Sequence, residues 1–315
     1  MLNDFLFSLN AVMPVFLTML AGVWFRRIGW VSESFASMMN QFVFRIALPL
    51  LLFQDLSGVD FAEVWDPSFV LYCFLATFAA IAVITVISMF FVERSVRGEF
   101  VQASYRSSAA IIGIAFMQNI YGSAEIGALM ILATVPLYNI AAVLVLTLLH
   151  PEQKGLDKKA LKKACIGVIT NPILIGIAAG VLWSCLKLPQ PVIMQRTIKN
   201  LASTATPLGL LSLGASFNFK EAVKQVRLTA VASAIKLVVL AALLLPIAIL
   251  LGFREQKLIA VLVMLGSATT VSSYVMAKNM GYEGTLTSGV VLVTTLFSSV
   301  TLTMWLFLMR VMSWV

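Results

Sequence analysis

Residues 266–281 read GSATTVSSYVMAKNMG, a run of small and hydroxyl-bearing residues that interrupts an otherwise apolar part of the chain. An earlier stretch, residues 104–122, reads SYRSSAAIIGIAFMQNIYG and resembles it. When the two stretches are aligned by a shift of 160 positions, Asn119 falls on Asn279 and serines or other small residues fall on each other. A polar interruption that occurs twice in an apolar chain predicts one polar pathway built from two copies.

The composition of the 315-residue chain excludes a water-soluble globule. Hydrophobic residues make up 60% of it and charged residues 11%, and the mean hydropathy is +0.98. Apolar runs of about 20 residues, the length that crosses a bilayer as a helix, recur along the chain. A membrane β-barrel would show short alternating segments instead. We therefore expect an all-α polytopic membrane protein with ten transmembrane helices, at residues 6–25, 35–56, 67–92, 100–121, 126–149, 163–185, 192–216, 226–252, 256–279 and 285–309.

The net charge of +8 comes mainly from basic residues in the short loops between apolar runs, where membrane proteins carry their orientation signals. This placement predicts a lipid bilayer as the surrounding medium and no nucleic-acid partner. Alternate loops are richer in Lys and Arg, and the richer set includes Arg26, Arg106 and Lys154. By the positive-inside rule this set faces the cytoplasm. We expect a multi-pass protein of the cell (inner) membrane with both termini outside the cytoplasm.

The second half of the chain repeats the first. At an offset of 158 residues, Gly22 aligns with Gly180 and Pro49 with Pro207, each within a similar local sequence. Each half holds five predicted spans, an odd number, so the two copies enter the membrane from opposite sides. Such a 5+5 inverted repeat is typical of secondary transporters, whose binding sites lie at the repeat interface and are formed by discontinuous helices.

Four stretches resemble the auxin efflux carrier family, in its bacterial type. They read MPVFLTMLAGVWFRRIGWVSE at residues 13–33, NQFVFRIALPLLLF at 40–53, YRSSAAIIGIAFMQNIYG at 105–122 and SATTVSSYVMAKNMG at 267–281. The resemblance extends over essentially the whole chain. It implies a fold like that of sodium/proton antiporters and bile-acid symporters, in which helices 4 and 9 are broken and cross at mid-membrane.

The same resemblance implies a division of the chain into two kinds of domain and an elevator mechanism. Residues 1–65 and 163–222 would form a scaffold of helices 1, 2, 6 and 7, through which two copies of the chain would dimerise. Residues 66–150 and 223–315 would form a transport domain of helices 3–5 and 8–10, and residues 151–162 a cytoplasmic linker. The family tends to place a proline in each crossing helix, whereas this chain has alanine at both positions.

Two basic residues, Arg45 and Lys236, fall well inside predicted spans, and no span carries a mid-helix Asp or Glu. Ionisable residues at this depth usually face the bundle interior or a water-filled cavity. Buried cations without buried acids favour an organic anion as ligand over sodium or protons. Two structural alternatives remain open: the cations snorkel to the interface or bond carbonyls of a broken helix, and single Ser and Thr residues commonly pack helices together.

The candidate substrate-binding residues share a polar or small side chain near the two interruptions, or a cation inside a span. They are Ser107, Ser108, Gly113, Asn119, Thr269, Thr270, Ser272, Ser273, Asn279, Lys236 and Arg45.

These features predict a secondary active transporter, for efflux or exchange of a small organic anion such as a mono- or dicarboxylate. One alternative is a non-transporting membrane sensor or receptor on the same scaffold. Another is a sodium-coupled symporter of a larger amphipathic anion. We expect that the protein is not an enzyme and binds no cofactor. The sequence lacks metal-ligand spacing, acidic pairs, nucleophile elbows and phosphate loops. Coupling to sodium or to protons is left open.

Overall fold

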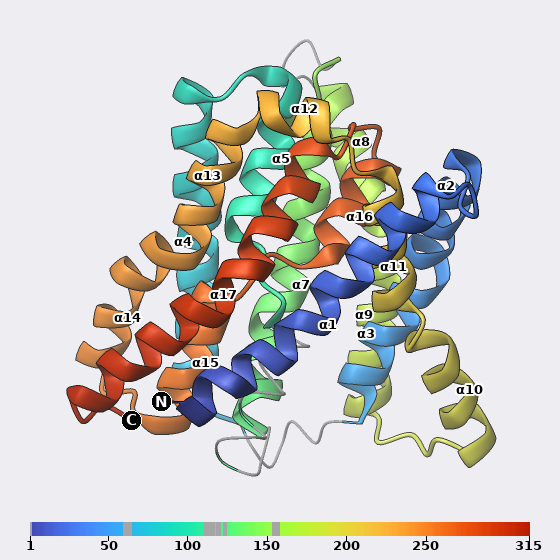
Figure 1. Ribbon diagram of the computed structural model, residues 1–315. Helices are drawn as coiled ribbons and strands as arrows, with labels where there is room; N and C mark the ends of the chain where they lie inside the picture. Colours follow the sequence, from blue (N-terminus) through green and yellow to red (C-terminus); the bar gives the residue numbers. More distant parts are fainter. Residues whose placement is uncertain (1, 59–64, 110–116, 118–120, 122–124, 153–157) are drawn as a thin grey trace.

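The computed structural model describes residues 2–58, 65–109, 117, 121, 125–152 and 158–315. In this part of the chain the backbone is helical apart from turns, short extended segments and one isolated β-bridge. The helices run between two ends of the molecule, and both termini lie at the same end (Figure 1). The α-helices are α1 (Leu2–Arg27), α2 (Glu33–Phe42), α3 (Leu48–Ser57), α4 (Pro67–Phe91), α5 (Arg94–Tyr105), α7 (Glu125–Leu148), α8 (Lys158–Ile169), α9 (Pro172–Cys185), α10 (Val192–Ala202), α11 (Ala205–Ser216), α12 (Phe219–Lys224), α13 (Val226–Ala234), α14 (Leu240–Leu250), α15 (Glu255–Gly266), α16 (Val271–Asn279) and α17 (Thr285–Val311).

Two π-helical turns join pairs of these helices into longer rods. The turn η1 (Val43–Ala47) connects α2 to α3, and η3 (Ile235–Val239) connects α13 to α14. Each holds one of the two basic residues predicted inside a span, Arg45 in η1 and Lys236 in η3. A π-turn adds a residue to the helical turn and changes the direction of the side chains around it.

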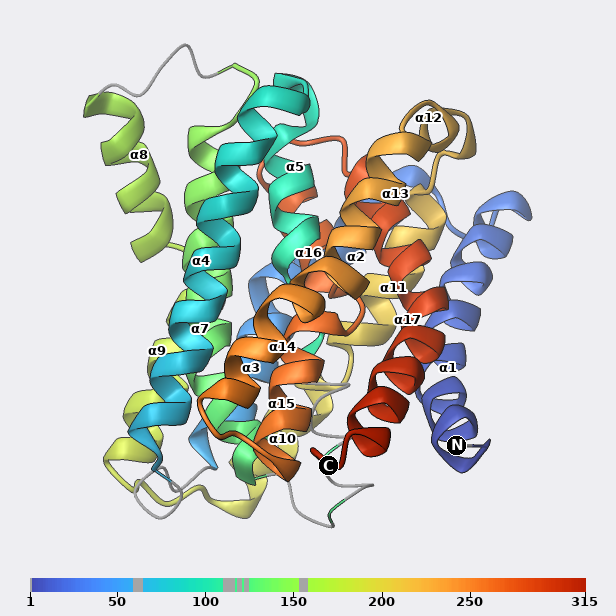
Figure 2. The same cartoon turned by 90° about the vertical axis from the view of Figure 1, so that its left-hand side faces the viewer.

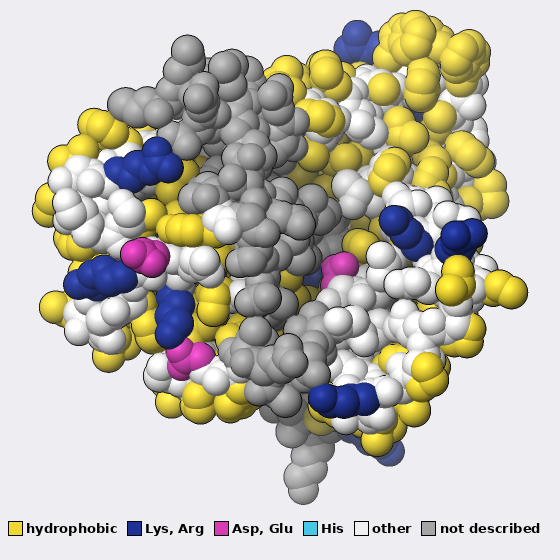
Figure 3. All heavy atoms as spheres, turned by 90° about the horizontal axis from the view of Figure 1, so that it is seen from below, with side chains coloured by type: hydrophobic (Ala, Val, Ile, Leu, Met, Phe, Trp, Pro, Cys, Tyr) yellow, Lys and Arg dark blue, Asp and Glu magenta, His cyan; other side chains and the backbone are white. Residues whose placement is uncertain are grey.

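Five helical rods in the described part of the chain are long and apolar enough to cross a membrane. They are Glu33–Ser57, Pro67–Phe91, Leu129–Leu148, Val226–Leu250 and Thr285–Val311. Large apolar side chains also cover the outside of the molecule. In the end-on view of Figure 3, charged side chains lie scattered among hydrophobic and uncharged atoms. The prediction of an all-helical, polytopic membrane protein is confirmed.

Several predicted spans are two helices rather than one. The span predicted at residues 163–185 divides into α8 and α9, because the Asn171 side chain accepts hydrogen bonds from the backbone N–H groups of Ile173 and Leu174 and so starts a new helix. Pro172 then occupies the first helical position, where its missing N–H costs nothing. Figure 2 shows α8 standing at the edge of the molecule.

Two helix pairs make unusually close backbone contact, and glycine permits both. A Cβ atom added at Gly22 in α1 would lie 2.4 Å from the carbonyl oxygen of Leu211 in α11. A Cβ atom added at Gly180 in α9 would lie 2.9 Å from the carbonyl oxygen of Phe53 in α3. The offset of 158 residues that aligns Gly22 with Gly180 also aligns Phe53 with Leu211. The two contacts are therefore equivalent once the halves of the chain are exchanged.

An ion pair joins α4 to α15 at the end of the molecule where the termini lie. The carboxylate of Asp66 accepts hydrogen bonds from the backbone of Ser68 and Phe69 and thus caps α4. Lys257 forms a salt bridge with the same carboxylate. Together with the hydroxyl of Ser68, Lys257 holds the pKa of Asp66 well below its usual range.

Candidate functional site

Two helix breaks meet in the interior of the molecule. Helix α5 ends at Tyr105 and α15 ends at Gly266, and each is followed by a short extended segment. These segments lie antiparallel and form a β-bridge between Ser107 and Thr269. The backbone N–H of Ser108 donates to the carbonyl of Ala268 at 2.9 Å. The two polar stretches that the sequence singled out therefore touch at this bridge.

Each extended segment supplies a hydroxyl to the helix end on the other side of the bridge. The last carbonyls of a helix have no partner within the helix, and inside a membrane such groups must find one in the protein. Ser107 donates its hydroxyl to the carbonyl of Met264 in α15. Thr269 donates its hydroxyl to the carbonyl of Ala103 in α5 at 2.8 Å. The paired breaks thus stabilise one another, without a proline in the described part of either segment.

A cavity of about 100 Å³ lies beside the bridge. One side of it is polar, with the two extended segments and residues of α7, α16 and α17. The lining from α1, η1, α3 and α11 is apolar apart from Thr206. The polar side comprises Arg106, Ser107, Ser108, Tyr138, Asn139, Thr269, Thr270, Ser272 and Thr295. The apolar side includes Val15, Val43, Leu48, Leu51, Leu52 and Ala205.

Arg106 is the cation of this cavity. Its side chain is buried, and its guanidinium donates to the side-chain oxygens of Asn139 at 2.6 Å and Gln102 at 3.2 Å. It also lies 2.8 Å from the sulfur of Met276. These partners are neutral, and no carboxylate in the described ranges contacts the guanidinium. We expected Arg106 in a cytoplasmic loop; that prediction was wrong, because α5 carries the residue into the interior before the chain breaks.

The acceptors of Arg106 are held in place by bonds of their own. The amide nitrogen of Gln102 donates to the carbonyl of Ser273 at 2.9 Å. The amide nitrogen of Asn139 donates to the carbonyl of Val135 at 2.8 Å. Because each amide group uses its N–H on a backbone carbonyl, its oxygen is directed toward the guanidinium. The orientation of Arg106 is thus fixed by neutral groups, and the described residues supply no counter-charge for it.

The first turn of α16 also faces the cavity. Thr270, Val271 and Ser272 line it, and the hydroxyls of Thr270 and Ser272 lie 3.2 Å apart. The N-terminus of a helix carries free N–H groups and a partial positive charge, which favours anions. Two features of the site therefore carry positive charge: the Arg106 guanidinium and the start of α16.

The structure brings together some of the predicted site residues and not others. Five of them line the cavity: Ser107, Ser108, Thr269, Thr270 and Ser272. Ser273 lies beside the cavity without lining it and donates its hydroxyl to the carbonyl of Thr270. Asn279 lies near the far end of α16, where its amide donates to the carbonyl of Val275 at 2.8 Å. Gly113 and Asn119 lie outside the described residues.

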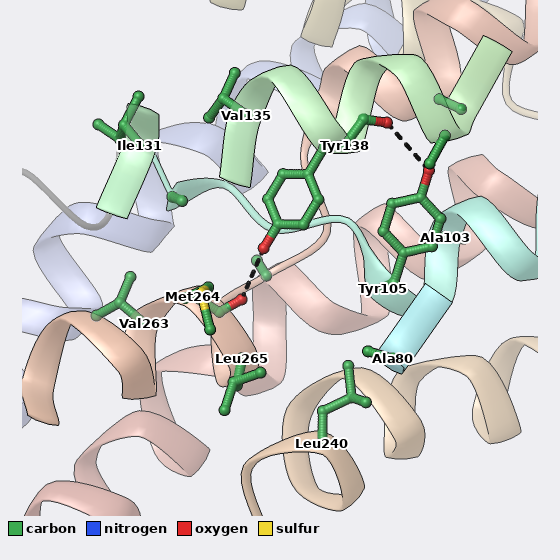
Figure 4. Close-up of a cluster of buried hydrophobic side chains, with 14 of the residues drawn as sticks. Ala80, Ala103, Tyr105, Ile131, Val135, Tyr138, Leu240, Val263, Met264 and Leu265 are labelled. Atoms are coloured by element: carbon green, nitrogen blue, oxygen red, sulfur yellow. Dashed lines mark hydrogen bonds between the residues drawn. The ribbon is translucent and has the colours of Figure 1, made fainter. Parts of the chain in front are cut away.

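Neither predicted cation lines the cavity. Arg45 is exposed on the outside of η1. Lys236 is completely buried, and its ammonium donates to the carbonyls of Leu265 at 2.5 Å and Met264 at 3.3 Å. It therefore contacts carbonyls of the broken helix, the arrangement left open above. Figure 4 shows the same carbonyl of Met264 from another side, where Tyr138 donates its hydroxyl to it at 3.3 Å.

Sequence reasoning missed Arg106, Asn139 and the buried carboxylate of Glu99. Arg106 lies six residues inside the span predicted at 100–121, so its own span assignment was the signal that it is not a loop residue. Asn139 is an amide within the apolar run 126–149. Glu99 precedes its predicted span by one residue, and its carboxylate accepts bonds from the backbone of Gly284 and Thr287 at the start of α17. It caps that helix and does not line the cavity.

Comparison with known proteins places the chain among membrane transporters. A family model described as membrane transport protein matches residues 7–306. The match includes both polar stretches and both halves of the predicted repeat. No curated protein matches the chain.

Proposed function

Because the chain belongs to the auxin efflux carrier family of membrane transport proteins, we propose that it is a secondary carrier of a small organic anion rather than an enzyme. The anion binds in the cavity beside the Ser107–Thr269 bridge. One observation carries the proposal: Arg106 is a buried cation that lines this cavity and has only neutral partners in the described part of the chain. A charge at this depth is costly and typically marks a substrate pathway.

The cavity favours an anion with one charged end and an apolar body. A carboxylate accepts two hydrogen bonds from a guanidinium, and this geometry is a common reason for placing Arg in such a site. The hydroxyls of Ser108, Thr270 and Ser272 and the free N–H groups at the start of α16 add further donors. The lining from α1, η1, α3 and α11 is aliphatic apart from Thr206. We infer a monocarboxylate with a compact hydrocarbon or aromatic portion as the substrate class.

The hydroxyls of the site divide into two roles. Those of Ser107, Thr269 and Ser273 bond backbone carbonyls at or next to the breaks and hold the extended segments in place. Those of Ser108, Thr270 and Ser272 are only partly buried and face the cavity. We assign substrate contact to the second group.

The division into a scaffold and a moving domain fits the two walls of the cavity. The apolar wall comes largely from the helices predicted as scaffold, and the polar wall from those predicted as transport domain. A smooth aliphatic wall has few hydrogen bonds to break when the opposite wall slides past it. The equivalent contacts of Gly22 with Leu211 and Gly180 with Phe53 support an inverted repeat within the scaffold. These features favour an elevator mechanism.

Flux measurements on purified protein in liposomes test the proposal. The probes are radiolabelled acetate, butyrate, benzoate and succinate, each tested for uptake and for exchange. We expect benzoate or butyrate to be transported best. Arg106→Gln should abolish this flux, because the amide keeps a polar side chain and removes the charge. Arg97→Gln is the matched control, since Arg97 bonds backbone carbonyls at the end of α4 and lies away from the cavity.

Three outcomes would contradict the proposal. Transport of none of these anions, together with sodium or proton exchange, would show a different carrier. Flux that survives Arg106→Gln would place the anion elsewhere. Saturable binding of benzoate without any flux would favour the sensor or receptor function over a carrier.

A further inference from the structure

Lys236 is the most completely buried charge outside the cavity. Its side chain has no exposed surface, and no carboxylate contacts it within the described ranges. Its ammonium donates to two backbone carbonyls, those of Leu265 and Met264. A buried cation usually has an anionic partner or a metal-like set of oxygen ligands around it. Lys236 has the second arrangement.

The two carbonyls belong to the last turn of α15. That turn ends at Gly266, and its carbonyls carry the partial negative charge of the helix C-terminus. The carbonyl of Met264 receives three donors: the hydroxyl of Ser107, the hydroxyl of Tyr138 and the ammonium of Lys236. Figure 4 shows the Tyr138 hydroxyl directed at this carbonyl. The helix break thus concentrates electronegative oxygen atoms around one positive group.

Two more buried oxygens lie on segments that adjoin the lysine and the helix end. The hydroxyl of Ser233 is buried on α13, three residues before Lys236, and the hydroxyl of Ser267 is buried directly after α15. Among the residues that the structure describes, neither has a hydrogen-bond partner. Carbonyl and hydroxyl oxygens are the ligands that hard cations such as sodium take in proteins. The Lys236 ammonium itself contacts two such oxygens, the carbonyls of Met264 and Leu265, while the two hydroxyls stay unbonded in the described part of the chain.

The backbone around Lys236 is built to place the ammonium there. The residue lies in the π-turn η3, where the extra residue changes the direction of its side chain. The indole N–H of Trp305 in α17 donates to the carbonyl of Leu237 in this turn at 3.2 Å. The π-turn is thus bonded to a neighbouring helix, and the lysine is held against the end of α15.

We propose that the ammonium of Lys236 is a tethered cation that occupies the position of a coupling ion at the break of α15. It neutralises the helix end in every step of the cycle, so that the fold needs no bound sodium there. It follows that anion transport is independent of sodium. This last consequence rests on the proposed function, whereas the occupation of the site by the ammonium does not.

Thermal unfolding of the purified protein tests the occupied site without any substrate. The melting temperature of the wild type should be equal in sodium chloride and in choline chloride at the same ionic strength. Lys236→Ala removes the ammonium and leaves room, so its melting temperature should fall. Methylammonium or sodium should restore it in part, by a shift of roughly 2–4 °C, because a ligand that binds only the folded state stabilises it.

Lys236→Met is the matched control for the emptied site. Methionine fills the space with an apolar chain and leaves no room for an ion, so its melting temperature should fall without responding to either cation. Stabilisation of the wild type by sodium over choline would overturn the proposal. So would a Lys236→Ala protein that responds to neither cation, or one that is as stable as the wild type. If Lys236→Ala does not fold, the proposal is still tested by comparing the melting temperature of the wild type in sodium chloride and in choline chloride.

Flux experiments test the consequence separately. Benzoate uptake by the wild type should be unchanged when sodium is replaced by choline on both sides of the liposome membrane. Uptake that requires sodium would overturn sodium independence. If no anion is transported, the proposed function fails while the unfolding measurements still decide the role of Lys236. The two failures are therefore distinguishable.

Discussion

Asn139→Asp should block anion binding by supplying Arg106 with a counter-charge of its own. The side-chain oxygen of Asn139 lies 2.6 Å from the guanidinium of Arg106, so aspartate would place a carboxylate in contact with it at nearly the same shape. The positive charge of Arg106, which we propose binds the anionic substrate, would then be neutralised within the protein. The substitution changes one atom of the side chain, which makes it a sharper probe than removal of the arginine.

The expected loss is large enough to measure. A hydrogen bond to a charged group contributes about 1.5–3 kcal/mol. Since about 1.4 kcal/mol corresponds to a tenfold change in the dissociation constant, binding should weaken by roughly 10- to 150-fold. The new pair forms in a buried site, where a matched ion pair is far less costly than a lone cation. The variant also loses the bond that Asn139 donates to the carbonyl of Val135, so we expect a melting temperature close to that of the wild type while affinity is lost.

Equilibrium binding of radiolabelled benzoate to the purified protein measures the change. Asn279→Asp is the matched control, because Asn279 also donates its amide to the carbonyl four residues earlier, at 2.8 Å, and does not line the cavity. Both variants lose that donor, but only the first gains contact with Arg106. Equal affinity in the two variants would refute the reasoning. Tighter binding in Asn139→Asp would refute it more directly, since it would show that the substrate is not an anion at Arg106.

Two further predictions concern stability. Gly22→Val places a side chain against a carbonyl of α11 that a Cβ atom alone would approach to 2.4 Å, and such overpacking costs about 1–3 kcal/mol. Gly58→Val, whose added Cβ atom meets no described residue within 4 Å, should leave the melting temperature nearly unchanged. An equal melting temperature in the two valine variants would contradict this contact. The ion pair of Asp66 with Lys257 should stabilise the fold by about 0.2–1 kcal/mol at neutral pH. The ion pair lowers the pKa of Asp66 in the folded state. Its contribution is therefore present above the unfolded-state pKa of Asp66, about 3.9, and is lost as the pH falls from there toward the folded-state pKa. Unfolding of Lys257→Gln and wild type between pH 3 and 7 measures it, and a difference that grows toward low pH would contradict the assignment.

Much of the helical fold could be predicted from composition and apolar runs alone. The predicted spans 67–92 and 285–309 correspond closely to α4 and α17. Helix boundaries inside the longer runs were harder to predict, because an asparagine followed by a proline, as at Asn171, is also compatible with a kinked single helix. The repeat with an offset of 158 residues was visible in the sequence; the equivalence of its backbone contacts required coordinates.

The sequence indicated which two stretches of the chain meet, but not which charged residue lines the cavity beside them. The polar stretches around Ser107 and Thr269 do meet, since small and hydroxyl-bearing residues can replace helical hydrogen bonds at a break. Arg106 was counted with the loop residues Arg94 and Arg97, which precede it in the chain, and charge counting cannot distinguish a loop from the end of a half-helix. Lys236 was expected to contact the substrate, whereas in the structure its ammonium donates to the carbonyl of Leu265 at the end of α15.

The two buried cations have a consequence for the energetics of the cycle. If the predicted transport domain, which carries Arg106 and Lys236, moves through the membrane, the membrane potential does work on both charges, about 2.3 kcal/mol per charge for each 100 mV crossed. A bound monocarboxylate cancels one of them. The empty form is then drawn toward the negative side of the membrane more strongly than the loaded form. The membrane potential would in this way act on the return of the empty form and, together with the anion gradient, influence the direction of net anion movement.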